Sequence, residues 1–142
     1  MSRFSRVLQS TSAAVILAVV GAASASVFSY GTLTASHDGS VRGKGYGTFS
    51  AYGYNQVKLT ATLADMTKDG TRTFVSGKGY GGDDYVSVES GRRADGGNTF
   101  ASMATKYGTA AGSTSGFTGY VKVCQDVSLS PDWCSSTKSG NM

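Results

Sequence analysis

The sequence predicts an all-β protein, a small antiparallel β-sandwich of about seven strands. Over residues 26–142 no stretch repeats its apolar residues at the spacing of a helix face. Short runs instead alternate apolar and polar residues, as at Val57, Leu59, Ala61 and Leu63. Turn-forming pairs such as Asp69-Gly70 separate these runs. A closed barrel is the alternative architecture.

The expected strands follow one another at short intervals along the chain. They cover residues 27–35, 43–52, 57–64, 71–76, 85–89, 99–107 and 117–123. Because Asp-Gly favours a tight turn, we expect residues 71–76 to pair directly with residues 57–64 as a hairpin.

One pattern occurs twice, as VRGKGYG at residues 41–47 and as VSGKGYG at residues 75–81. In an extended chain its three glycines share one face, and its lysine and tyrosine share the other. The bare face can admit another backbone or an aromatic ring. Strand glycines more often reflect sheet geometry, so we expect two bent or edge strands whose glycines are covered by cross-strand tyrosines.

Residues 1–25 have the three parts of a secretory signal peptide. Arg3 and Arg6 make a basic start, residues 13–23 form an apolar run, and Ala23-Ser24-Ala25 is a small-residue cleavage site. The apolar run is shorter than the about 20 residues that span a bilayer. We therefore expect a secreted, extracellular protein that has no membrane contact after cleavage. It would comprise an extended segment, residues 26–40, and a sandwich domain, residues 41–142.

The net charge does not point to an anionic partner. The formal charge of +4 falls to +2 when Arg3 and Arg6 leave with the signal peptide. We therefore expect no binding to nucleic acid, and the length suits one domain rather than a large multidomain enzyme.

Cys124 and Cys134 are the only cysteines. In an exported chain such a pair predicts a disulfide, which would hold the C-terminal tail against the last strand. Zinc is a poor alternative because His37 is the only histidine and no further cysteine exists. A nucleophilic cysteine would need that same histidine as its base.

The sequence lacks the residue sets on which common catalytic sites depend. His37 lies in His37-Asp38-Gly39-Ser40, which is typical of a turn, and no other imidazole exists. Glu89 with Asp83 or Asp84 is the one conceivable glycosidase pair, but Gly81-Gly82-Asp83-Asp84 is typical of a solvated loop. No calcium-binding loop pattern is present. We expect no enzymatic activity, no cofactor and no metal.

Two features predict binding. All eight tyrosines follow the signal peptide, and tyrosine with glycine and serine is common in recognition surfaces. Ser26–Ser36 is β-prone, and it can either complete its own sheet or pair in a partner's groove. The candidate partner-binding residues are Val27, Phe28, Tyr30, Thr32, Leu33, Tyr46 and Tyr80.

Two sequence features carry a family resemblance. Leu63-Ala64-Asp65 is followed by Lys68-Asp69-Gly70, and the chain ends in Val121-Lys122-Val123-Cys124-Gln125-Asp126 and Pro131-Asp132-Trp133-Cys134. Together with the signal peptide, they make residues 55–136 similar to the small secreted β-sandwich proteins of Streptomyces and related actinobacteria.

One functional group of this size and layout is the small adaptor subunit of umbrella toxin particles, which are secreted antibacterial assemblies. In that family the adaptor's N-terminal segment inserts into a lectin subunit, and its body docks on the repeats of a long toxin-bearing polypeptide. The resemblance implies that Ser26–Ser36 is the insert and that the partners are other secreted proteins, a lectin subunit and a large repeat-containing toxin protein.

The sequence therefore favours a secreted, non-enzymatic adaptor that binds other proteins. A carbohydrate-binding module that uses Tyr46, Tyr80 and Lys78 is one alternative. A secreted enzyme inhibitor that presents the loop from Ser128 to Trp133 is another.

Overall fold

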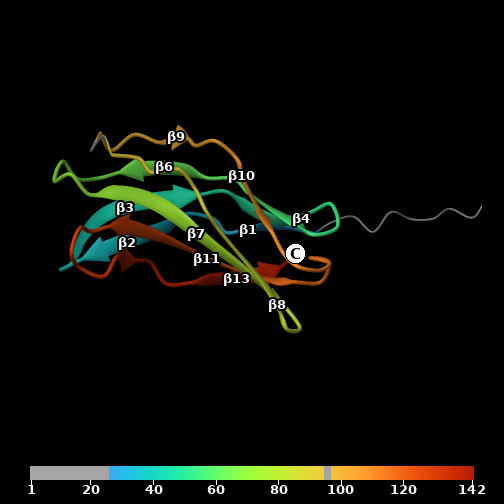
Figure 1. The fold of residues 1–142 in the computed structure, drawn as a ribbon. Helices are drawn as coiled ribbons and strands as arrows, with labels where there is room; N and C mark the ends of the chain where they lie inside the picture. The colour runs from blue at the N-terminus through green and yellow to red at the C-terminus, as the bar shows by residue number, and fades with distance from the viewer. Residues whose placement is uncertain (1–25, 95–96) are drawn as a thin grey trace, which may run out of the picture.

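A computed structural model of the chain describes residues 26–94 and 97–142. Within those ranges the structure contains strands and no helix (Figure 1), so the predicted all-β class is confirmed. The predicted signal peptide, residues 1–25, lies outside the described residues.

The described strands form three sheets in which every pairing is antiparallel. Sheet A has the order β1 (Val27–Ser29), β4 (Thr48–Tyr52), β5 (Gln56–Leu59), β10 (Lys106–Thr109). Sheet B has the order β2 (Leu33–His37), β3 (Ser40–Tyr46), β6 (Thr62–Asp65), β9 (Ala101–Ser102). Sheet C has the order β12 (Trp133–Cys134), β11 (Thr118–Asp126), β7 (Arg72–Gly81), β8 (Asp84–Glu89), and β13 (Lys138–Asn141) also pairs with β11.

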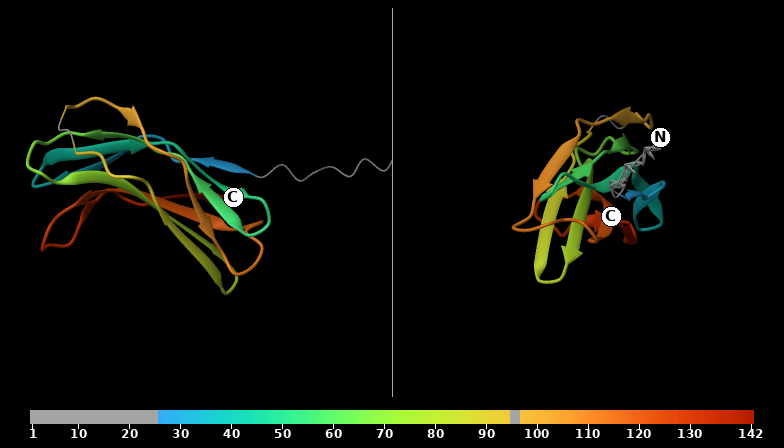
Figure 2. Two further views of the ribbon diagram at one scale, coloured as in Figure 1. Left: turned by 45° about the horizontal axis from the view of Figure 1, so that its top comes forward. Right: turned by 90° about the vertical axis from the view of Figure 1, so that its right-hand side faces the viewer.

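Sheets A and B together make one layer of a sandwich, and sheet C makes the other (Figure 2). The chain passes directly between A and B four times, from β1 to β2, β3 to β4, β5 to β6 and β9 to β10. Hydrogen bonds bridge this junction: the Tyr30 amide donates to the Gly47 carbonyl at 3.2 Å, and the Tyr30 hydroxyl donates to the Thr60 carbonyl at 2.7 Å. The layer is therefore one sheet bent at its middle.

All seven predicted ranges contain strands, and four of them are divided at this bend. Counted through the bend, they are the seven strands expected from the sequence, and β12 and β13 are short additions that follow them. The sequence does not predict these two strands, because Trp133–Cys134 is only two residues long and Lys138–Asn141 does not alternate apolar with polar residues.

The hairpin predicted between residues 57–64 and 71–76 is wrong. β6 pairs with β3 and β9, whereas β7 pairs with β8 and β11 in the facing sheet, so residues 66–71 cross between the layers. The crossing segment has its own bonds, since the Thr71 hydroxyl donates to Asp69 at 2.6 Å and its amide donates at 3.1 Å. The Thr71 hydroxyl and amide, together with Thr67 and Arg42, lower the pKa of the Asp69 carboxyl.

The recurring glycines face the space between the layers. A Cβ on Gly45 would lie 2.7 Å from Leu63 Cδ2, and one on Gly77 would lie 3.3 Å from the ring of Phe49. β3 and β7 are interior strands, and side chains from the packed core rather than cross-strand tyrosines cover these glycines. The expected tyrosine cover is therefore wrong for Gly45 and Gly77, although the Tyr30 hydroxyl does lie against Gly47, and the alternative of a face that admits an aromatic ring is correct for Gly77.

Apolar side chains from both layers fill the core. Its most buried members include Phe49, Val57, Leu59, Leu63, Val75, Val121 and Val123. Because inward positions alternate along each strand, the other side of sheet C turns its side chains outward.

Candidate ligand-binding groove

Seven of the eight tyrosines are exposed, and only Tyr30 is buried. They form three groups on the outside of the sandwich. Tyr80, Tyr85 and Tyr120 lie on sheet C, Tyr52 and Tyr107 on sheet A with Tyr54 in the loop between β4 and β5, and Tyr46 on sheet B. A tyrosine that is present mainly to fill a core would be buried, so these rings are available for contact.

The tyrosines of sheet C come from three neighbouring strands. The register places Tyr80 of β7 opposite Tyr85 of β8, and Lys78 of β7 opposite Tyr120 of β11. The ring centroid of Tyr80 lies 5.9 Å from that of Tyr85 and 5.7 Å from that of Tyr120. These distances are in the range of stabilising aromatic pairs, so the three rings support one another.

A shallow open hollow of about 360 Å³ lies beside these rings. We call it the tyrosine–lysine groove, and it is lined by Ser76, Lys78, Tyr80, Tyr120, Lys122 and Thr137. Lys122 lies opposite Ser76 in the register, next to the Lys78–Tyr120 pair. Two ammonium groups, three hydroxyl-bearing side chains from β7 and β11, and Thr137 therefore surround one space.

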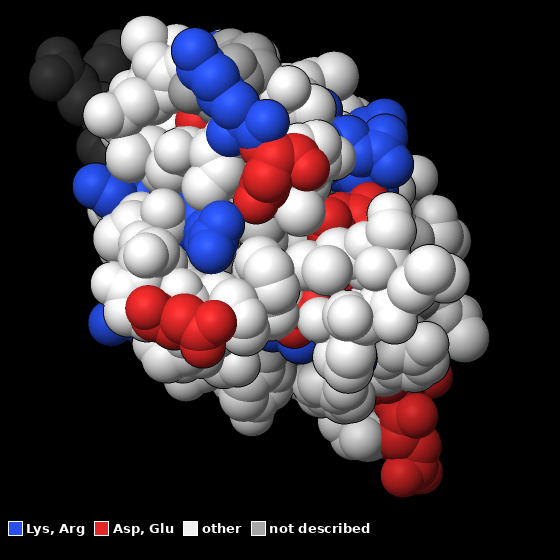
Figure 3. All heavy atoms as spheres, turned by 90° about the vertical axis from the view of Figure 1, so that its left-hand side faces the viewer, with Lys and Arg blue, Asp and Glu red and all other residues white. Residues whose placement is uncertain are grey.

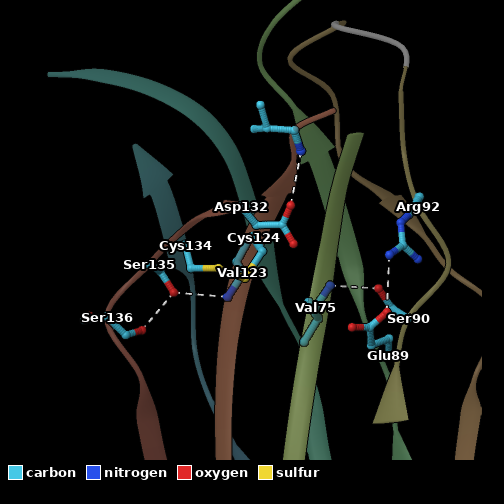
Figure 4. Close-up of a disulfide and its surroundings, with 11 residues drawn as sticks. Val75, Glu89, Ser90, Arg92, Val123, Cys124, Asp132, Cys134, Ser135 and Ser136 are labelled. Atoms are coloured by element: carbon cyan, nitrogen blue, oxygen red, sulfur yellow. Dashed lines mark hydrogen bonds and ion pairs between the residues drawn. A yellow bond between two sulfur atoms is a disulfide. The ribbon is translucent and has the colours of Figure 1, made fainter. Parts of the chain in front are cut away.

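A second hollow of about 530 Å³ adjoins the groove and shares Ser76, Lys78 and Lys122 with it. It runs along the same face toward Glu89, Asp132 and the disulfide. The predicted bond between Cys124 and Cys134 is present, which confirms it, and joins β11 to β12 at this end (Figure 4). The Ser135 hydroxyl accepts a hydrogen bond from the Val123 amide at 3.0 Å beside it.

Arg92 lies at the far end of this outer face of sheet C. Its guanidinium lies 4.5 Å from the centroid of the Phe74 ring and donates to Asp126 at 2.8 Å. It also contacts Glu89 at 3.3 Å (Figure 4). The charges at this end are therefore paired with one another. In Figure 3, which faces one end of the molecule, several basic side chains lie next to acidic ones.

The structure places the candidate residues of the N-terminal segment in β1 of sheet A, in β2 of sheet B and in the connection between them. Phe28 and Tyr30 are buried at 8% and 2% exposure, because β1 pairs with β4 and Tyr30 lies at the bend. Val27 and Thr32 are exposed, and Leu33 is half-buried in β2. While these strands stay paired, a partner cannot reach Phe28 or Tyr30.

The two remaining candidates lie on opposite layers. Tyr80 and Lys78 line the groove, whereas Tyr46 lies on sheet B with its ring centroid 5.3 Å from that of Phe100. The structure therefore does not bring together the Tyr46, Tyr80 and Lys78 set expected for a carbohydrate site. It brings Tyr120 and Lys122 to Tyr80 and Lys78 instead.

The side chains considered for catalysis are dispersed. His37 stacks on Trp133 with ring centroids 3.7 Å apart and lies 3.1 Å from Asp38. Asp84 and Glu89 are the two ends of β8, about 16 Å apart along an extended strand. Because they are five positions apart, their side chains also point to opposite faces of the strand, whereas a glycosidase pair flanks one bond.

Residues 26–94 and 97–142 contain no group of three or more His, Cys, Asp or Glu placed to hold a metal ion. They also contain no helix long and apolar enough to cross a membrane.

Comparison of the chain with known protein families, curated proteins and solved structures finds no match.

Proposed function

We propose that the protein is a non-enzymatic adaptor that acts outside the cell and binds a partner protein with its tyrosine–lysine groove. The observation that carries the proposal is the gathering of Tyr80, Tyr85 and Tyr120 from three strands beside an open hollow. Tyrosine supplies a large contact area at a low cost in side-chain entropy, and serine and lysine around it supply hydrogen bonds. A rigid sheet holds all of them in place before a partner arrives.

The proposal keeps the adaptor role that the sequence predicts, but it assigns partner binding to the tyrosine–lysine groove instead of the N-terminal segment. Insertion of Ser26–Ser36 into a lectin subunit would require β1 and β2 to leave β4 and β3. It would also expose Phe28 and Tyr30, which belong to the core. Use of the groove requires neither change.

Paired tyrosine variants test the proposal. The purified chain is immobilised and incubated with the culture medium of the organism that produces it, and captured proteins are identified by mass spectrometry. Tyr80→Ser/Tyr120→Ser is expected to reduce capture of a specific protein at least about tenfold, as for central interface residues. The matched control is Tyr52→Ser/Tyr107→Ser, whose rings also pair, with centroids 5.1 Å apart, on sheet A.

The control variant is expected to capture as much of the protein as the unmodified chain. Equal capture by both variants, equal loss in both, or recovery of this chain alone would contradict the proposal. Circular dichroism and thermal unfolding of each variant establish that both are folded.

A carbohydrate-binding module is the second candidate, because Lys78 and Tyr80 do line one hollow. Tyr80 is, however, near-parallel to Tyr85 at an interplanar angle of 24°, which occupies part of the ring face that a sugar would stack on. A glycan array tests it: binding that Tyr80→Ser/Tyr120→Ser abolishes would favour the module over the adaptor.

The inhibitor alternative depends on the loop from Ser128 to Trp133. Leu129 in this loop is fully exposed, and the Val127 amide donates to Asp132 at 3.2 Å across it. A panel of proteases and glycosidases tests this role, and no slowing of any of them is expected if the groove is the binding site.

A further inference from the structure

The tyrosine–lysine groove carries an unbalanced positive charge. Its lining contains Lys78 and Lys122 and no carboxylate. Each ion pair between described residues uses His37, Arg42, Arg72 or Arg92 as the cation, and none uses Lys78 or Lys122. Two ammonium groups thus share one hollow without an acidic neighbour within ion-pair distance.

Two of the three acids nearest along the face are paired with arginines. Glu89 contacts Arg92 at 3.3 Å, and Asp126 accepts from Arg92 at 2.8 Å and lies 3.6 Å from Arg72. Asp132 accepts a hydrogen bond from the Val127 amide at 3.2 Å. Glu89 and Asp126 are therefore paired with arginines at the Arg92 end, Asp132 is in none of these ion pairs, and the two lysines lie toward the tyrosine end.

We infer that the groove takes an acidic segment of the partner polypeptide, with two of its carboxylates at Lys78 and Lys122. This inference rests on the proposed function. An ammonium group in a partly walled site gains most from an anion that displaces its water and approaches within hydrogen-bond distance. The tyrosine hydroxyls beside it donate to the same carboxylates or to peptide carbonyls.

The packing of the tyrosine rings favours a polypeptide as the occupant. The rings of Tyr80, Tyr85 and Tyr120 pack against one another, which leaves tyrosine edges and hydroxyls rather than one broad flat face for a sugar ring. Residues 1–25 of this chain are excluded as the occupant by their own charge, because they contain Arg3 and Arg6 and no acid.

Charge reversal in the groove tests the inference. Lys78→Glu/Lys122→Glu is expected to weaken capture of the partner at least about tenfold, since like charges across an interface cost several kcal/mol. Lys68→Glu/Lys106→Glu changes the net charge equally at two exposed lysines outside the groove, and it is expected to leave capture nearly unchanged. Capture by the unmodified chain should fall as NaCl is raised, because surface charges are screened.

A defined probe identifies the ligand chemistry. Fluorescence anisotropy is measured with a fluorescein-labelled peptide rich in glutamate and serine, and with the same peptide carrying glutamine at each glutamate. Salt-sensitive binding of the glutamate peptide alone, lost in Lys78→Glu/Lys122→Glu, supports the inference. Binding of polygalacturonate without binding of the glutamate peptide would overturn it in favour of an anionic glycan.

The two proposals fail in different ways. Capture that is lost in Tyr80→Ser/Tyr120→Ser but equal in the two lysine variants overturns the acidic segment and leaves the adaptor role in place. Capture that is unaffected by either groove variant overturns both.

Discussion

Thr73 and Gln125 join across sheet C in the interior, where the Thr73 hydroxyl donates a 2.8 Å hydrogen bond to the Gln125 carbonyl oxygen. Neither residue has measurable exposure. The Gln125 amide nitrogen in turn donates to Asp65 and to the Arg42 carbonyl, each at 3.1 Å, and to Thr71 at 2.9 Å. One side chain therefore connects sheet C to β3, to β6 and to the segment that crosses between the layers.

Replacement of Gln125 by leucine is expected to lower the free energy of unfolding by about 2–4 kcal/mol. The change keeps the volume but leaves several buried polar groups without their partner, and each costs about 1–3 kcal/mol if it finds no other. Urea unfolding measures the loss. Asn141→Ala, at an exposed amide on β13, is the control and should change stability by less than about 0.5 kcal/mol. A loss below about 1 kcal/mol in Gln125→Leu would show that this network does not hold the layers together.

Burial of Tyr30 should make the free energy of unfolding depend on pH in the alkaline range. Burial raises the pKa of its phenol well above the ordinary value, whereas the unfolded chain ionises near pH 10. Above pH 10 the unfolded state loses a proton that the folded state keeps, so the free energy of unfolding falls, by up to about 1.4 kcal/mol per pH unit.

Comparison with Tyr30→Phe isolates this contribution. The variant loses the 2.7 Å bond to the Thr60 carbonyl, so it should be about 1 kcal/mol less stable at neutral pH. It should also lose stability more slowly between pH 9 and about 11, because it has no phenol to ionise there. Parallel pH profiles for the two proteins would contradict the burial of a neutral phenol.

Gly45, the second glycine in its copy of the repeated pattern, and Gly77, the first glycine in the other copy, should respond differently to alanine. A Cβ on Gly45 would come within 2.7 Å of Leu63 and 3.0 Å of Val123, whereas the nearest atom to one on Gly77 is 3.3 Å away. Gly45→Ala is therefore expected to cost about 1–3 kcal/mol through overpacking. Gly77→Ala should cost less than about 1 kcal/mol, and thermal unfolding ranks the two. The reverse order would contradict the packing of sheet B on sheet C.

Phe28 decides whether the N-terminal segment is part of the fold. Its ring lies against Gly140 of β13 and is 8% exposed, so Phe28→Ala should lower the free energy of unfolding by about 3 kcal/mol or more. Val27→Ala, at a side chain that is 61% exposed, is the neighbouring control and should cost less than about 0.5 kcal/mol. Unchanged stability in Phe28→Ala would mean that the segment is free to leave its sheet, as insertion into a partner requires.

Much of the fold could be predicted from the sequence because alternation and turn residues are local signals. The positions of the strands follow from them, and Tyr120 and Lys122 of β11 alternate with Val121 and Val123 in the sequence itself. The disulfide follows from the single pair of cysteines. The partners of each strand could not be predicted. Asp69-Gly70 looks like a hairpin turn, yet the buried contacts of Asp65 and Gln125 carry that segment across to the other layer.

The groove could not be predicted for the same reason. Lys78 and Tyr80 belong to β7, and Tyr120 and Lys122 belong to β11, about 40 residues later; only the register between these strands makes them neighbours. The exposure of Tyr80 also depends on the packing, because core side chains such as Phe49 and Phe117 lie against the glycines at the inward positions of β7 and leave no room for a larger residue there.

The exposed tyrosines provide the most direct test of the groove as the partner-binding site. Hydroxyl-radical footprinting of the chain, alone and with its captured partner, measures the oxidation of each tyrosine by mass spectrometry. The groove predicts that the partner protects Tyr80, Tyr85 and Tyr120 and leaves Tyr52, Tyr54 and Tyr107 as reactive as before. Protection of Tyr52, Tyr54 and Tyr107 with unchanged oxidation of Tyr80 and Tyr120 would contradict it.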